Sequence, residues 1–389
     1  MKTYKSLVVF LILPIFLYCS IIQVHGTDSK ETEYFETVRG KVIEILNSEK
    51  DNIEKRNKPV SCLVKVEILN GKHSGKVVNA EYTISAGYVN KENPILIKPR
   101  DTVLIYLNQN SNGEVINAYI SDTVRDKYLL YLVGTFIFFL LAIGRFKGLK
   151  AIITLGVTAF AIIKFFIPLI IEGYDPIAVS IGVCIVITTL TLIIIGGLNK
   201  KAAAAIIGTI GGFAVAGGIT QFIGSLANLT GLGNEEAQML MNMPQSVNIN
   251  FRGLLFSGII IGALGATMDV GMSISSAMHE IEMTNPKIKK SALIGSGMNI
   301  GRDIMATMSN TLILAYAGSS LHLLLLLIMH DIPFIEIINS DMIASEVVRS
   351  LAGSLGLIFT IPITAIAAGV LSSRKQSHNP GRKRKKQYV

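Results

Sequence analysis

Tryptophan is absent from this sequence of 389 residues, and charged residues make up only 16% of it. Cysteine occurs only at Cys19, Cys62 and Cys184, which are too dispersed for a disulfide framework or a thiolate metal site. The sequence has no GxxxxGK[ST] phosphate loop and no His/Cys spacing of the zinc type. These absences argue against a disulfide-stapled domain and against ATP-driven work by this chain alone, and they predict no cofactor.

The sequence is rich in apolar residues and in glycine. Hydrophobic residues account for 50% of it, and there are 35 glycines. This composition is typical of integral membrane proteins whose helices pack closely in lipid. The net charge of +9 is concentrated near the C-terminus, between Arg374 and Lys386. Such a tail could bind nucleic acid or anionic lipid, but a topology signal on the cytoplasmic side is favoured, so no nucleic-acid partner is predicted.

The first 127 residues divide into two regions. Residues 1–26 have basic residues, then an apolar run, then small residues, which is typical of a signal peptide or an uncleaved N-terminal anchor. Residues 27–127 contain short β-branched runs separated by turn signals such as the pair Asn70 and Gly71. This pattern predicts a small extracytoplasmic β-barrel or sandwich of about five to six strands.

Residues 128–372 are mostly apolar and predict a helical membrane domain of about seven spans. The expected spans are 128–146, 151–171, 176–198, 202–225, 252–275, one within 291–329, and 351–372. Basic clusters follow alternate spans, whereas the connections 172–175, 226–251 and 331–349 are acidic. This alternation predicts that residues 27–127 lie outside and that the basic tail 373–389 is cytoplasmic.

The segment 291–329 is too long for one simple span, because it would form a continuous helix of about 58 Å. The hydrocarbon core of a bilayer is only about 30 Å thick. Two full spans here would move the basic tail outside, so we expect one broken or re-entrant segment. The glycines of Gly295–Gly297 and then Gly301 are the predicted position of the break.

Asp269 lies within one of these apolar runs, "LGATMDVGMSISSAMHE". Ser273 and Ser276 follow at i+4 and i+7, on the same face of a helix. A carboxylate at this depth costs about 2.5–3.5 kcal/mol on the insertion scale, so its presence argues for a use. Small residues at Gly258, Gly262 and Ala266, and similarly at 208, 212 and 216, predict that these two helices pack close to the polar site.

The run "GSGMNIGRDIMATMSNTLILAYAG" carries a second polar stripe. Asn299, Asp303, Thr307 and Asn310 recur at i, i+4, i+8 and i+11, and Asp303 is expected at a depth similar to that of Asp269. Arg302 points elsewhere and could pair with Glu280 or Glu282, or with a lipid head group. The two stripes together predict a buried, oxygen-rich site for a cation or proton. Hydrogen bonding between helices is the structural alternative, and Asp303 could instead cap a helix.

Four strings resemble the YibE/F-like family of membrane proteins. They are "GLLFSGIIIGALGA", "GALGATMDVGMSISSAMHEI", "SGMNIGRDIMATMSNTLILAYAG" and "VVRSLAGSLGLIFTIPITA", and the similarity extends over about residues 38–372. The resemblance implies a protein of the bacterial cytoplasmic membrane with a role in transport. The matching strings include Asp269, Asn299, Arg302, Asp303 and Asn310, but the resemblance does not assign a chemical role to these residues.

Three functions follow from these features. The first is a permease for an unknown ion or small solute, acting in the lipid bilayer through the two aspartates. The second is a scaffold or assembly factor that presents the external β-domain. That domain could bind a second copy of the chain, forming a homo-oligomer, or a different partner protein. The third, an intramembrane hydrolase, is disfavoured because neither aspartate has the Gly-x-Gly-Asp context, so no enzymatic activity is predicted.

Overall fold

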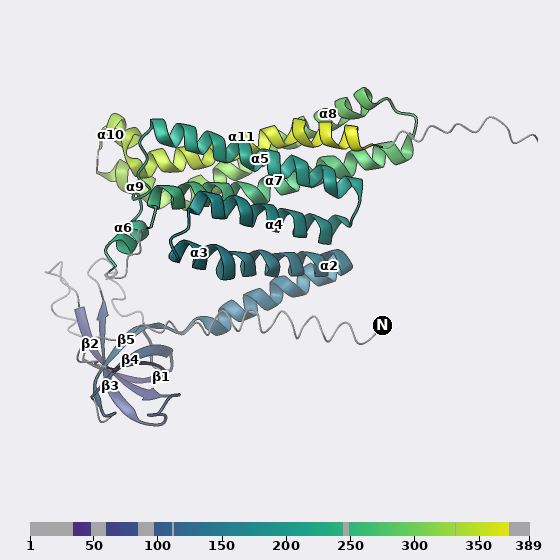
Figure 1. Ribbon diagram of the computed structural model, residues 1–389. Coiled ribbons are helices and arrows are strands. Elements are labelled where there is room, and N and C mark those ends of the chain that lie inside the picture. The colour runs from purple at the N-terminus through teal and green to yellow at the C-terminus, as the bar shows by residue number, and fades with distance from the viewer. Residues whose placement is uncertain are drawn as a thin grey trace, which may run out of the picture. The chain divides into compact units, whose positions relative to one another are not determined.

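The computed structural model of the protein describes residues 34–47, 60–84, 97–110, 113–243, 249–330 and 332–372. The predicted signal peptide or anchor, residues 1–26, and the basic tail, residues 373–389, lie outside the described residues. The chain divides between Leu140 and Leu141 into two compact units (Figure 1).

The first unit contains a closed five-stranded β-barrel. Its strands are β1 (Tyr34–Asn47), β2 (Val60–Ile68), β3 (Val77–Ile84), β4 (Thr102–Gln109) and β5 (Val115–Thr123). They are hydrogen-bonded in the order β1-β2-β3-β5-β4, and β3 and β5 are parallel whereas the other pairs are antiparallel. This is a Greek-key barrel like those of OB-folds, so the alternative of a sandwich is excluded.

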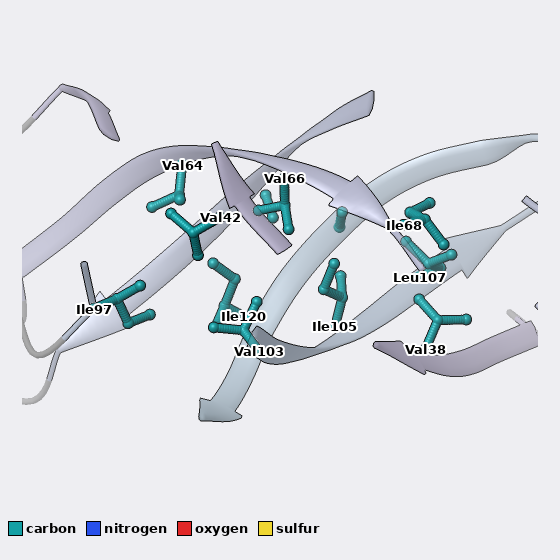
Figure 2. Close-up of a cluster of buried hydrophobic side chains, with 12 residues drawn as sticks. Val38, Val42, Val64, Val66, Ile68, Ile97, Val103, Ile105, Leu107 and Ile120 are labelled. Carbon is teal, nitrogen blue, oxygen red and sulfur yellow. The ribbon is translucent and has the colours of Figure 1, made fainter. Parts of the chain in front are cut away.

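The barrel core follows from the alternation of side chains along each strand. In β4, Val103, Ile105 and Leu107 are buried and point into the same interior as Val38 and Val66 (Figure 2). Strand β1 pairs with β4 through its first half and with β2 through its second half, and Gly40 lies where it changes partner. A Cβ atom on Gly40 would overlap the side chain of Ile105, so only glycine fits at this corner.

The second unit is helical and begins within the first helix. The helical elements are α2 (Asp126–Ala161), the π-helix η3 (Ile162–Phe166), α3 (Ile167–Ile171), α4 (Pro176–Gly196), α5 (Lys200–Leu226), α6 (Glu235–Met241), α7 (Phe251–Thr284), α8 (Lys290–Ser319), α9 (Leu321–Met329), α10 (Phe334–Asn339) and α11 (Asp341–Leu371). Side chains that accept a hydrogen bond from the first turn fix the beginnings of the long helices. Asp175, Asn199, Asn250 and Ser340 cap α4, α5, α7 and α11 in this way.

Among the described residues, five helical segments are long and apolar enough to cross a membrane, and a sixth is counted if the bent pair α8 and α9 is one span. The five are Asp126–Ile171, Pro176–Gly196, Lys200–Leu226, Phe251–Thr284 and Asp341–Leu371. The first of these has 46 residues and is longer than one crossing requires. Arg145 has φ 48° and ψ −125°, so this run consists of two helical pieces joined at Arg145.

Close packing of α5 against α11 forms the centre of the helical unit. A Cβ atom on Gly208 would overlap the hydroxyl of Thr364, and one on Gly212 would overlap that of Thr360. The small residues of α5 therefore face α11. On α7, by contrast, Gly258 is exposed and a Cβ there would meet nothing within 4 Å. Helices α5 and α7 do pack together, as predicted. The small residues of α5 face α11, however, and a Cβ atom on Gly258 of α7 would touch no other helix among the described residues.

The predicted position of the break in segment 291–329 is wrong. Helix α8 continues through Gly295, Gly297 and Gly301, and the chain bends by 57° only between α8 and α9. A Cβ atom on Gly297 would overlap Sδ of Met278, and one on Gly301 would overlap Cγ2 of Ile361. The helix is continuous at these two glycines, and their lack of a side chain allows α8 to approach α7 and α11 closely.

Candidate functional site

Helix α7 packs against α4, α5, α8 and α11, yet one of its faces stays exposed. From Gly258 to Ser273 the exposed positions recur every three or four residues and carry only small or polar side chains. We call them the α7 stripe: Gly258, Gly262, Gly265, Asp269 and Ser273. Ser276 continues the same face and is half-buried. Asp269 is therefore the charged group in a row of residues with little side-chain bulk.

The two flanks of the α7 stripe contact different helices. Met268 packs against the buried cluster that includes Cys184 of α4, and Ala266 packs against the cluster that includes Leu293 of α8. The stripe therefore lies between the sides of α7 that face α4 and α8.

Helix α8 carries the second group of predicted site residues. Its buried residues are Leu293, Gly297 and Gly301, whereas the five predicted polar residues are exposed: Asn299, Arg302, Asp303, Thr307 and Asn310. Nη1 of Arg302 donates a hydrogen bond to Oδ1 of Asn299 at 3.0 Å, and the Thr307 hydroxyl donates to the carbonyl of Ile304 at 2.9 Å. The glutamate at position 282 accepts a hydrogen bond from the Ser372 hydroxyl instead of pairing with Arg302.

The contacts between α7 and α8 set the relative depth of the two aspartates. The positions that face each other are Met278 with Gly297, and Ile274 with Gly301, so the helices are antiparallel. Continuing this register places Asp269 level with about residue 306, which is within about one helical turn of Asp303. The register thus supports the predicted similarity in depth.

The predicted burial of this polar group is wrong for a single chain. Asp269 and Asp303 are both exposed, as are the polar residues on the outer face of α8. The spacing of polar residues gives the face on which they lie, but only the positions of the neighbouring helices decide whether that face is covered. Within the described residues, no group of three His, Cys, Asp or Glu side chains could hold a metal ion.

A second polar cluster, which the sequence analysis missed, lies between α11 and α7. Glu346 and Arg349 form an ion pair in which Oε1 and Nη1 are 3.4 Å apart. They line a cavity of about 250 Å³ together with residues of α6, α7 and the preceding loop. Nearby, the guanidinium of Arg252 lies over the ring of Phe256 at 5.5 Å. The i,i+3 spacing of Glu346 and Arg349 was a usable signal, but both had been assigned to a connection between spans.

Electrostatics in the first unit is simpler. Nη1 of Arg125 donates a hydrogen bond to Oδ2 of Asp122 at 2.7 Å and holds the pKa of this carboxyl below its usual value. Burial in the barrel raises the pKa of the Cys62 thiol. Neither group is part of a cluster with catalytic geometry, so the chemistry-bearing residues of interest lie in the helical unit.

Long apolar helices, two of which carry an aspartate within their length, joined to a small β-barrel, define a helical membrane protein with an attached β-domain. A model of the family described as YibE/F-like protein matches residues 132–374, which is more than half of the 389 residues. The chain belongs to the YibE/F-like family, and the resemblance seen in the sequence is confirmed. The match begins within α2, so the family assignment depends on the helical unit rather than on the barrel. No curated protein and no solved structure matches the chain.

Proposed function

We propose that the protein is a multi-pass permease of the bacterial cytoplasmic membrane that moves a cation or proton past Asp269 and Asp303. The observation that carries this proposal is the α7 stripe, because it runs along a helix that is otherwise apolar and well packed. A row of glycine, serine and aspartate gains nothing from contact with lipid. It is suited to lining a path that is covered by protein or filled with water.

We infer seven spans. In this proposal the 46-residue run crosses twice, with its non-helical residue Arg145 between the two crossings, and the bent pair α8 and α9 crosses once. With α4, α5, α7 and α11, the total is seven. An odd number of spans puts the β-domain and the C-terminus on opposite sides, as the distribution of basic residues predicts.

The two aspartates are the groups best suited to the chemistry. Carboxylate and hydroxyl oxygens bind hard cations, and a carboxylate can also accept and release a proton. Asp269 and Asp303 come from adjacent antiparallel helices and lie at a similar depth, so two carboxylates are available to an ion at one level of the helical unit. Thr307 and Asn310 supply further oxygens on α8, whereas Oδ1 of Asn299 accepts a hydrogen bond from Arg302.

Reconstitution of the full chain into liposomes tests this proposal. A pH-sensitive dye inside the vesicles reports proton flux, and imposed gradients of Na⁺, K⁺ and Mg²⁺ test the cations. We expect Asp269→Asn and Asp303→Asn to abolish the flux, whereas Glu280→Gln retains it because Glu280 lies near the end of α7, beyond the α7 stripe. Flux at the level of the natural sequence in both aspartate variants would refute the mechanism.

A scaffold is the second candidate function, and the barrel surface favours it. Large apolar side chains are exposed there, including Tyr106, Ile116 and Tyr119. They fit a surface that binds another protein. If Ile116→Ser and Tyr119→Ser release a co-purifying partner, and the protein shows no flux for any of the cations tested, the scaffold role replaces the permease.

A further inference from the structure

The cavity beside Glu346 and Arg349 has features of a binding site for a small molecule. It has a volume of about 250 Å³, and it is lined by α6 and its preceding loop, by α7 and by α11. The contact of Gly353 with Ala263 places Arg349 level with about Ile259, which is about 15 Å along the helix axis from Asp269. The cavity is therefore separate from the two aspartates, although Gly258 belongs both to its wall and to the α7 stripe.

Several polar atoms at this cavity are buried without a hydrogen-bond partner among the described residues. The ion pair engages Oε1 of Glu346 and Nη1 of Arg349, which leaves Oε2 of Glu346 and Nε of Arg349 unpaired. Ser345 is only 6% exposed, and its hydroxyl also has no partner in the described part of the chain. A buried polar group without a partner is destabilising, so these atoms favour a ligand that supplies both an acceptor and a donor.

The rest of the wall is polar at α6, where Asn234 and Glu236 line it, and apolar on α7 and α11. Leu254 and Leu255 come from α7, and Met342 comes from α11. A ligand that fits both parts of the cavity has a hydrophobic body and a polar end. The charges of the wall narrow the choice of ligand, because a simple anion would be repelled by Glu236 and Glu346 and a simple cation by Arg349.

We propose that this cavity binds a small zwitterion of the amino-acid class. The carboxylate of the ligand accepts a hydrogen bond from Nε of Arg349, and its ammonium group donates to Oε2 of Glu346. Its apolar side chain lies against Leu254 and Leu255. The site goes beyond the proposed permease function, since binding at equilibrium requires neither flux nor the two aspartates.

Binding to the purified full chain in detergent tests the proposal. The probes are the twenty common L-amino acids, each radiolabelled and measured by equilibrium dialysis. We expect saturable binding of those with apolar side chains. N-acetyl-leucine lacks the ammonium group and leucine amide lacks the carboxylate, so each should bind at least tenfold more weakly than leucine. Absence of saturable binding for all twenty overturns the proposal, and equal binding of leucine and either analogue overturns the zwitterion assignment.

Substitutions locate the site. Arg349→Lys and Glu346→Gln each remove one charge-assisted hydrogen bond, so affinity should fall about tenfold or more. Arg125→Lys in the first unit and Glu280→Gln are the matched controls and should bind as the natural sequence does. If either substitution in the ion pair leaves the affinity unchanged, the assigned contact is wrong.

A substitution that fills the cavity distinguishes loss of binding from loss of folding. A Cβ atom on Gly258 meets nothing within 4 Å, so Gly258→Leu can extend into the cavity without a backbone clash. It should keep the protein monodisperse and abolish binding. Gly265→Leu is the matched control, because Gly265 is also open on α7 but does not line the cavity. Binding that persists in Gly258→Leu places the ligand elsewhere and refutes the site.

Discussion

Two glycines of α8 provide a sharp test of how this helix packs. A Cβ atom on Gly301 would overlap Cγ2 of Ile361 and lie 3.1 Å from Cβ of Ile361 and 3.2 Å from Cδ1 of Ile274. Carbon atoms in contact normally lie about 3.5–4.0 Å apart. Both isoleucines are buried, so they have little room to move. A Cβ atom on Gly295, earlier in the same helix, meets nothing within 4 Å.

The expected effects of Gly301→Ala and Gly295→Ala therefore have opposite signs. Overpacking of a close contact costs about 1–3 kcal/mol, and alanine is favoured over glycine within a helix by about 0.8–1.0 kcal/mol. Gly301→Ala should lose up to about 2 kcal/mol of stability, and Gly295→Ala should gain about 0.8–1.0 kcal/mol. The difference between the two variants is the overpacking cost alone, about 1–3 kcal/mol.

Thermal unfolding of the full chain in detergent measures this difference. Each kcal/mol shifts Tm by about 2–4 °C in a domain of 150–250 residues, and Gly295→Ala should have the higher Tm. A broken or re-entrant segment at Gly295 would give the reverse result, because alanine would then be forced into a conformation that glycine tolerates better. A lower Tm for Gly295→Ala than for Gly301→Ala would refute the continuous α8 helix.

Two further predictions concern the helix interface and the barrel. Gly212→Ala should lower Tm, because its Cβ would lie 2.8 Å from the carbonyl oxygen of Gly356. Gly218→Ala is the control and should not lower Tm, because a Cβ there meets nothing within 4 Å. Equal Tm values for the two variants would contradict the close packing of α5 on α11. The pKa of Asp122 is lower in the folded than in the unfolded state, so its pairing with Arg125 stabilises the barrel above the unfolded pKa of about 3.9 and is lost as pH falls through the folded pKa. Arg125→Gln should raise the pKa of Asp122 in an NMR titration, and an unchanged pKa would exclude the ion pair as its cause.

The barrel strands could be predicted from the sequence because their signals are local. The runs around Val38, Val64, Val78, Ile105 and Ile116 all became strands, since β-branched residues bounded by turn residues favour that conformation wherever they occur. Closure into a barrel required more. Pairing of β1 with both β2 and β4 joins residues far apart in the sequence, and no local pattern specifies it.

The break in the segment 291–329 was misplaced because glycine has two opposite uses. It permits an irregular backbone, and it also permits close approach of a neighbouring helix. The sequence could not distinguish these uses, since the residues that make the difference, Met278 and Ile361, belong to other helices. The ion pair of Glu346 and Arg349 was missed for a related reason, because it becomes notable only beside the cavity that α6 and α7 complete.

The sequence by itself determined that this is a membrane protein of the YibE/F-like family with a β-rich domain before its helices. It also determined that Asp269 shares a helical face with Ser273, because the periodicity of a helix is a local property. Only the tertiary structure decided that this face is exposed between α4 and α8, that α8 is continuous, and that a charged cavity lies beside α11. Exposure, close approach and enclosure depend on neighbouring helices, whose positions no single stretch of sequence contains.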